Sequence, residues 1–299
     1  MSPSTGASRP PSTANQFPLP GSGRAAVAVP APGEGLGQWA GAPSAAQDDD
    51  ESFVVAYRTR GGTAPEDPAA TVVARSDDGE RLTTVATLDK SRFDAMSMER
   101  PALVRTANGR WRLYVCSATK GSKHWWIDVL ETDDPGGLAE ADARTVFPGD
   151  ETTAVKDPIV QHAGGAWHAW LCCHPLDDAG EEDRFWSAYA TSEDGLDWRW
   201  HGDVLTPRPG RWDARGARLT AVLGDGRAAY DGRATKEENW FERTGLARRV
   251  EGRFEQDDGP PVSIARYLDV VPLRAGGYRI YYESPLPGGS HELRTELIA

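Results

Sequence analysis

Cysteine is scarce in this sequence, and the few residues present exclude two kinds of cross-link. The three cysteines, Cys116, Cys172 and Cys173, are an odd number, and all fall in apolar, strand-like runs. Free thiols are commonly buried in such runs. A disulfide framework is therefore not expected, and neither is a cysteine-based zinc site.

The chain also lacks a surplus of positive charge. It carries 33 Lys and Arg against 45 Asp and Glu, for a formal net charge of −12. Such a chain has little to neutralise phosphates with, so we expect neither a nucleic acid nor an anionic membrane as its partner. A local basic pocket is still compatible with this balance.

Long apolar runs are missing as well. No stretch approaches the roughly 18 apolar residues of a membrane span, and residues 1–23 are rich in Ser, Pro and Thr, without the apolar core of a secretory signal. We therefore expect a cytoplasmic protein, with residues 1–24 as a disordered tail.

Aromatic residues and turn formers, in contrast, are abundant. The 299 residues include 11 Trp and 32 Gly, which favours many short strands joined by turns over long helices. Five segments share one order: a polar residue, an apolar strand, a Gly-containing turn and a second strand, rich in aromatics in most of them. These segments begin at Gly41, Met98, Lys156, Ala217 and Tyr267.

The spacing of these segments predicts the fold. Pro43, Pro101 and Pro158 lie 58 and 57 residues apart, and a unit of this length that begins with a hairpin matches a four-stranded propeller blade. The fifth unit offers only three strands, and the apolar run Ala25–Val29 is the candidate for the fourth. Its pairing there would cover both open edges.

The prediction is thus an all-β chain in which residues 25–299 form a single five-bladed β-propeller, closed by an N-terminal strand. A β-sandwich, or two small β domains, is the alternative.

The same reasoning places a functional site. The first strand of a blade lines the central channel, and its start lies on the same face as the end of the second strand, because the two are antiparallel. Residues at these positions should converge on one mouth. The carboxylates expected there are Glu99, Asp157, Asp231 and Glu283. The expected substrate-binding residues are Trp39, Arg100, Lys156, His174, Arg215, Arg218, Arg233, Arg266 and Tyr267.

Structural roles stay open for these residues. Asp157 precedes a proline and can open a strand, Asp231 precedes a glycine and can belong to a turn, and His174 can lie in a surface loop. Glu283 has no such turn role. The cationic members can bind a ligand carboxylate or phosphate, or they can neutralise the carboxylates beside them.

Several nucleotide, metal and nucleophile signatures are absent. The sequence contains no P-loop, no dinucleotide fingerprint after a strand, no His-Glu-x-x-His and no Gly-x-Ser-x-Gly. The acidic stretches 48–50 and 177–183 lack the spacing of a calcium loop. We expect neither a cofactor nor a metal, and a small molecule as the substrate.

Three short motifs resemble those of a known group of enzymes. Lys156-Asp157-Pro158, Tyr230-Asp231-Gly232-Arg233 and Tyr282-Glu283-Ser284-Pro285 resemble strand starts and ends in the five-bladed propeller glycosidase superfamily, which includes glycoside hydrolase families 43, 32 and 130. The resemblance spans about residues 25–299. It implies that Asp157 is an electrostatic modulator or base and Glu283 the general acid, with Glu99 or Asp231 completing the set.

One departure from that group affects the expected activity. Families 43 and 32 place an essential Asp at the start of the first blade, where this chain has Gly41-Ala42-Pro43-Ser44. The resemblance implies a glycosidase- or phosphorylase-like enzyme acting on a small sugar or glycoside, and the cationic residues expected at the mouth favour an anionic one. The missing Asp favours two alternatives: a non-hydrolytic cyclase, isomerase or lyase that uses the same pocket, or a catalytically silent binding propeller.

Overall fold

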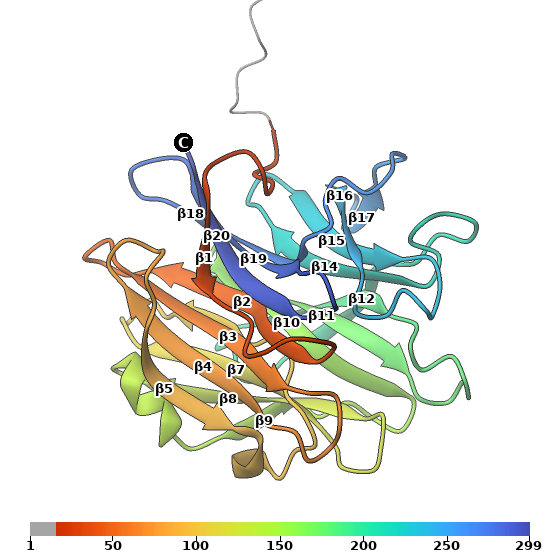
Figure 1. Ribbon diagram of the computed structural model, residues 1–299, viewed down its shortest axis with the longest axis horizontal. Helices are drawn as coiled ribbons and strands as arrows, with labels where there is room; N and C mark the ends of the chain where they lie inside the picture. The colour runs from red at the N-terminus through yellow and green to blue at the C-terminus, as the bar shows by residue number, and fades with distance from the viewer. Residues whose placement is uncertain (1–15) are drawn as a thin grey trace, which may run out of the picture.

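A computed structural model describes residues 16–299 of the chain (Figure 1). Within these residues the chain forms twenty β-strands and two short 3-10 helices, η2 (Lys90–Phe93) and η3 (Pro135–Ala139), and no α-helix. None of the described helices is long and apolar enough to cross a membrane. The all-β prediction is confirmed.

Twelve of the strands form three sheets of four strands each, paired in chain order. We number the strand groups in chain order, and these three sheets are the second, third and fourth groups. The second group consists of β6 (Ala102–Arg105), β7 (Trp111–Ala118), β8 (Trp125–Thr132) and β9 (Arg144–Phe147). The third is β10 (Thr153–Ala163), β11 (Ala166–Pro175), β12 (Trp186–Ser192) and β13 (Arg199–Leu205). The fourth is β14 (Gly216–Val222), β15 (Arg227–Arg233), β16 (Arg243–Val250) and β17 (Arg253–Gln256).

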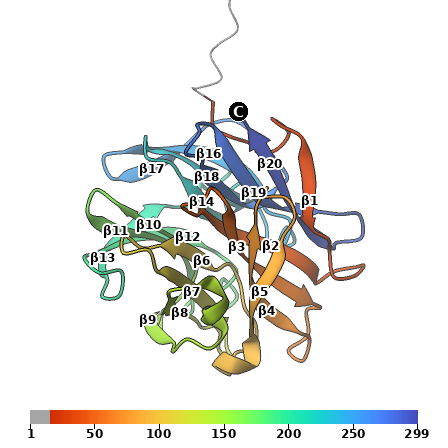
Figure 2. The same cartoon turned by 90° about the vertical axis from the view of Figure 1, so that its left-hand side faces the viewer.

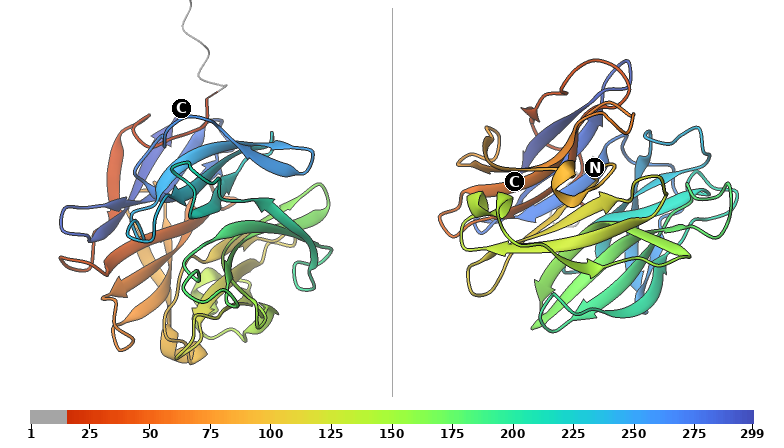
Figure 3. Two further views of the ribbon diagram at one scale, coloured as in Figure 1. Left: turned by 90° about the vertical axis from the view of Figure 1, so that its right-hand side faces the viewer. Right: turned by 90° about the horizontal axis from the view of Figure 1, so that it is seen from below.

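The other eight described strands form one sheet from both ends of the chain. The first strand group is β2 (Gln38–Gln47), β3 (Phe53–Gly61), β4 (Ala69–Ser76) and β5 (Thr83–Asp89). The fifth is β18 (Arg266–Pro272), β19 (Tyr278–Pro285) and β20 (His291–Ile298), with β1 (Ala25–Val29) antiparallel to β20. One parallel pair, Trp39 with His291, joins β2 to β20. In Figures 2 and 3 the blue C-terminal strands lie beside the red N-terminal ones.

The first strands of the groups surround a common centre, which we call the hub. β2 contacts β6 and β18, β10 contacts β6 and β14, and β14 contacts β18. The twenty described strands and their four-stranded sheets fit five blades. We call the end of the hub where these first strands begin the mouth.

Apolar clusters hold neighbouring groups together. One packs Tyr114 and Ile127 of the second group against Trp167 and Leu171 of the third. Four further clusters among the described residues join the other consecutive groups, including the fifth group to the first. Trp167 is 6% exposed, so its large side chain contributes to the packing between two groups.

Bulges in three first strands determine where their side chains point. The pairing of β2 with β3, of β10 with β11 and of β18 with β19 shifts register near the strand start. Ala42, Asp157 and Tyr267 lie within these shifts, with φ of 51°, 49° and 50°. A left-handed non-glycine residue costs about 1 kcal/mol or more, and bulges commonly re-aim a side chain. Three first strands therefore carry the same left-handed residue near their starts, at the mouth.

The segment before β1 was expected to be a disordered tail. Residues 1–15 lie outside the described residues, but Phe17 is buried in the apolar cluster of the fourth and fifth groups. The amides of Gly21 and Gly23 donate to the Glu296 carboxylate at 2.9 and 3.0 Å. The described part of this segment is thus held against β20.

Candidate functional site

The four carboxylates expected at the mouth do converge on the hub. Glu99 precedes β6, Asp157 lies in β10, Asp231 in β15 and Glu283 in β19. Glu99 is 6% exposed, Asp157 1%, and Asp231 and Glu283 are fully buried. Glu99 is therefore the one of the four closest to solvent.

Glu283 is held by three cationic or potentially cationic groups. Arg58 Nη2 donates to its Oε2 and Arg266 Nη1 to its Oε1, both at 2.6 Å, and His291 Nδ1 lies 2.6 Å from the same Oε1. Burial by itself raises the pKa of Glu283, but Arg58 and Arg266 outweigh it and lower that pKa well below its ordinary value. Glu283 is thus kept ionised.

Glu99 shares Arg58 with Glu283. Arg58 Nη1 donates to Glu99 Oε2 at 2.6 Å, and Arg60 Nη1 lies 3.7 Å from Glu99 Oε1. Burial alone would raise the pKa of Glu99, but Arg58, Lys156 and Arg60 outweigh burial and lower it to about 2. The free site therefore holds Glu99 as a carboxylate.

Arg218 connects the other two carboxylates. Its Nη1 donates to Asp157 Oδ2 at 2.7 Å and its Nη2 to Asp231 Oδ2 at 2.8 Å. Its guanidinium carbon also lies 3.9 Å from the centre of the Tyr267 ring. The Tyr267 hydroxyl donates to Glu99 at 3.3 Å, which links the two halves of the network. Burial raises the pKa of Asp231, and Arg218 offsets this only in part.

Two members of the network that lie at strand starts were not predicted, Glu242 and His291. Glu242 Oε2 lies 2.7 Å from Arg266 Nε, and Arg233 Nη1 donates to its Oε1 at 3.0 Å. Both missed residues lie at the start of a third strand, before β16 and in β20. A third strand begins on the face where the second one ends, so the same rule, taken one strand further, would have found them.

Lys156 and His174 lie nearer the solvent. Lys156 Nζ is 3.8 Å from Asp157 Oδ2 and 4.9 Å from the centre of the Trp125 ring. His174 is partly buried, and its Nδ1 lies 3.1 Å from the Glu182 carbonyl oxygen. Burial, helped by Lys156, lowers the pKa of His174 well below its ordinary value, so the imidazole is neutral.

Trp39 occupies a place that does not suit its expected role, and Arg215 lies at the edge of the network. Trp39 is fully buried and stacks on His291 with ring centres 5.3 Å apart, so it has no free face for a ligand. Trp240, 5.5 Å from Trp39, is only partly buried. Arg215 Nη2 donates to Asp183 at 2.6 Å, and Asp183 in turn accepts from Arg233 at 3.3 Å. Both predictions rested on strand position alone.

Arg100 turns away from the mouth. Its amide donates to Asp157 at 3.2 Å, but its guanidinium donates to the Thr220 carbonyl at 2.8 Å and to Asp269 at 3.1 Å. Thr220 and Asp269 follow the strand starts toward the opposite end of the hub. Arg100 therefore serves the far side of the network and not the mouth.

At the start of β2, where the resemblance implies an Asp, another residue fills the space. A Cβ atom on Gly41 would lie 2.2 Å from Glu283 Oε2, closer than any atoms pack. Ala42, the next residue, is fully buried. Glu283 thus occupies the space beside the start of β2, which accepts no side chain at Gly41.

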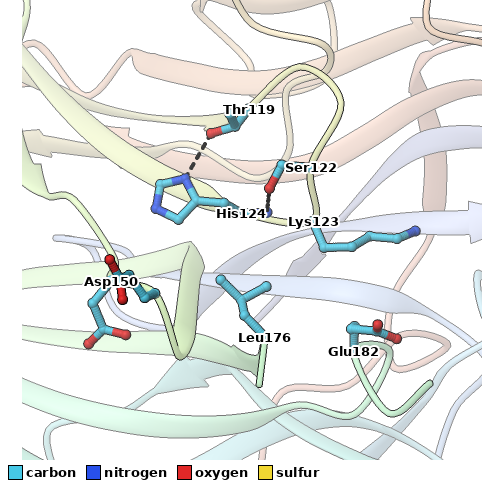
Figure 4. A pocket seen from close by; sticks show the side chains of 8 residues that line it. Thr119, Ser122, Lys123, His124, Asp150, Leu176 and Glu182 are labelled. Atoms are coloured by element: carbon cyan, nitrogen blue, oxygen red, sulfur yellow. Dashed lines mark hydrogen bonds between the residues drawn. The ribbon is translucent and has the colours of Figure 1, made fainter. Parts of the chain in front are cut away.

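A cleft of about 690 Å³ lies on the mouth face between the second and third groups (Figure 4). Thr119, Lys123, His124 and Leu176 are among the residues that line it. The His124 ring nitrogens lie 2.8 Å from the Thr119 hydroxyl and 2.8 Å from the Pro148 carbonyl. Among the described residues no group of three or more His, Cys, Asp or Glu is arranged to hold a metal ion.

Comparison with known proteins identifies the fold of this chain. No protein-family model matches the chain, and no curated protein sequence does. A β-1,2-mannobiose phosphorylase from Listeria innocua is 12% identical, with a TM-score of 0.60 over 95% of this chain and 93% of that one. A thermostable family-43 glycoside hydrolase is 13% identical, with a TM-score of 0.64 over 86% of this chain and 89% of that one.

A third similar structure is the sucrose-6-phosphate hydrolase of Lactobacillus gasseri, 9% identical with a TM-score of 0.64; the match covers 93% of this chain and 61% of that one. The chain has the propeller fold of these enzymes. The expected resemblance to propeller glycosidases is confirmed at the level of the fold.

Proposed function

We propose that this chain is an enzyme of the glycoside phosphorylase and hydrolase type, acting on a small anionic sugar or glycoside at the mouth of a five-bladed ring closed by β1. The observation that carries the proposal is the position of Glu99, the least buried of the four hub carboxylates, beside Arg60 and Lys156. The shared fold with phosphorylases and hydrolases supports it.

The two cations beside Glu99 are suited to an anion. The side chains of Arg60 and Lys156 are 13% and 14% exposed, and their nearest carboxylate oxygens lie at 3.7 and 3.8 Å. Both distances are longer than a charge-assisted hydrogen bond. A phosphate or carboxylate oxygen from a ligand would complete these contacts.

Transfer to phosphate fits the missing first-blade carboxylate. Hydrolysis uses one carboxyl group to activate water or attack carbon and a second to protonate the leaving oxygen. In phosphorolysis the phosphate oxygen itself attacks the anomeric carbon, the glycosidic bond breaks, and only the proton for the leaving oxygen is needed. One carboxyl group therefore suffices.

Glu99 is the carboxyl group that we assign to this step. A phosphate bound to Arg60 and Lys156 adds negative charge beside Glu99, which raises its pKa and allows it to carry a proton. Glu283, the acid implied by the family resemblance, is fully buried under Arg58 and Arg266. We assign it a positioning role.

The test is turnover of aryl mannosides, aryl uronides and sugar phosphates by the purified protein, with and without inorganic phosphate. Glu99→Gln should lower kcat by about 100-fold or more, and Lys156→Met should raise the KM for phosphate. Glu131→Gln, in β8, the third strand of its group, is the matched control and should leave both values unchanged. Turnover that persists in Glu99→Gln contradicts the assignment.

A silent binding propeller is the second candidate, because all four hub carboxylates, Glu99 included, are bound by guanidinium groups. It predicts a ligand-induced rise in Tm without turnover. Glu99→Gln would then change neither rate nor product, since no reaction occurs.

A further inference from the structure

A cavity enters the hub from the end opposite the mouth. Its volume is about 300 Å³, and its walls include Ala45, Leu103, Ile159 and Val270, from four of the first strands. A wider hollow of about 620 Å³ shares several of these walls and extends to Val222 of β14. The wall residues follow the mouth residues along each first strand, so the cavity lies on the far side of the charged network.

One ion pair lies at the inner end of this cavity. Asp269 Oδ1 accepts from Arg100 Nη2 at 3.1 Å, and Oδ2 accepts from the Ala45 amide at 2.8 Å. The side chain of Asp269 is 16% exposed and that of Arg100 1%. The carboxylate is therefore the more exposed member of the pair, and the other charged wall residue, Arg274, is bound to Asp49 at 2.6 Å.

Within this pair, the Asp269 carboxylate can still accept further hydrogen bonds. Each nitrogen of the Arg100 guanidinium already has an acceptor: the Pro43 carbonyl, the Thr220 carbonyl and Asp269. Each oxygen of Asp269 has one donor, although a carboxylate oxygen accepts about two hydrogen bonds. A ligand that fits here donates hydrogen bonds.

We propose that this cavity is a second ligand site, for a small ammonium compound whose nitrogen contacts Asp269 and whose apolar body lies against Leu103, Ile159 and Val270. A cation is favoured over a neutral donor because Asp269 has a single cationic partner, Arg100, and the nearby Arg274 is paired with Asp49. The site is separate from the mouth and goes beyond the proposed reaction. Arg100 connects the two, since its amide donates to Asp157 of the hub.

The protonation of Asp269 gives the site a pH dependence. The charged and titratable side chains around Asp269 are Arg100, Arg274 and Tyr281. Burial raises the pKa of Asp269 to about 6, and Arg100 offsets this only in part. An ammonium group binds the ionised form, so its affinity falls as the pH drops through that value.

Calorimetric titration of the full chain with benzylammonium tests the site, with benzyl alcohol as the neutral control. Benzylammonium should bind about tenfold more weakly at pH of about 5 than at about 7.5, because roughly nine-tenths of Asp269 is protonated at the lower pH. Asp269→Asn should weaken binding by at least as much. Benzyl alcohol should show no such pH dependence.

Val270→Trp is a second variant that keeps Asp269 and fills the cavity. It should abolish binding while circular dichroism stays unchanged, which separates loss of the site from loss of the fold. Two results would overturn the proposal: no binding of benzylammonium to the wild type at millimolar concentration, or wild-type affinity in both variants. Neither result bears on turnover at the mouth.

Discussion

The two halves of the central axis are built from opposite kinds of residue. At the mouth half, Arg58, Arg218 and Arg266 are nearly fully buried and each is bound to carboxylates. In the far half, Leu103 and Ile159 line a cavity of about 300 Å³ with one ion pair at its inner end. One half is filled by charge and the other is left hollow.

The contrast comes from the order of residues in the first strands. In β10, Lys156 and Asp157 precede Ile159 and Val160. A buried charge is tolerated only when it is paired and hydrogen-bonded, so the mouth half must be closely packed with partners. Apolar side chains need no polar partners when they are buried, so a cavity that they line can stay open.

The largest expected effect on stability comes from a substitution in the ion-pair network of the mouth half. Arg58→Met leaves Glu99 and Glu283 without their shared partner and should lower the free energy of unfolding by about 3–5 kcal/mol. Urea denaturation measures it. Arg60→Met is the control, because Arg60 pairs more loosely with Glu99 at 3.7 Å, and should cost about 1 kcal/mol or less. Equal stability of the two variants would contradict the pairing described here.

The pH dependence of stability should have opposite signs in the two halves. Glu242, in the mouth network, has a pKa lowered from its ordinary 4.5 to about 2 by Arg266 and Arg233, against burial. Its contribution is complete above pH 4.5 and is lost as the pH falls toward 2. Asp269, in the far half, has a pKa raised from 3.8 to about 6 by burial, so its contribution is present below pH 3.8 and is lost as the pH rises through 6.

Urea denaturation at a series of pH values separates these two effects. The stability difference between the wild type and Glu242→Gln should shrink from pH 4.5 toward 2. Asp269→Asn should remove the loss that the wild type shows as the pH rises toward 6. Parallel pH profiles for all three proteins would show that neither carboxyl group is perturbed.

A smaller effect tests how tightly the mouth half is packed. In Gly41→Ala the new methyl group would meet Glu283 Oε2 at 2.2 Å, and relief of this contact should cost about 1–3 kcal/mol. Gly224→Ala, where nothing lies within 4 Å of the added atom, is the control. Thermal unfolding of both variants measures the difference, and a Gly41→Ala protein as stable as its control would indicate a looser network.

The smallest effect is expected in the far half. Val270→Phe adds volume where the cavity has room, so it should cost less than about 1 kcal/mol. Val115→Phe, at a fully buried core position, should cost about 1–3 kcal/mol or more. Similar losses in urea denaturation would mean that the cavity closes in solution.

The sequence located most of the hub network but not the roles within it. The rule that first strands start where second strands end found Glu99, Asp157, Arg218 and Glu283, because it depends only on chain direction. It missed Glu242, since third strands were not considered. It also placed Arg100 at the mouth, although its guanidinium points to the far half. The direction of a side chain depends on neighbours from other groups.

By itself the sequence determined the all-β architecture and the repeated strand units, because strands and glycine turns are local features. Only the tertiary structure decided which charges meet. Arg58 and Glu283 are 225 residues apart in the chain, yet they form a 2.6 Å pair. It also decided that one half of the axis is closed by such pairs and the other stays hollow, since burial and pairing depend on residues from all the strand groups at once.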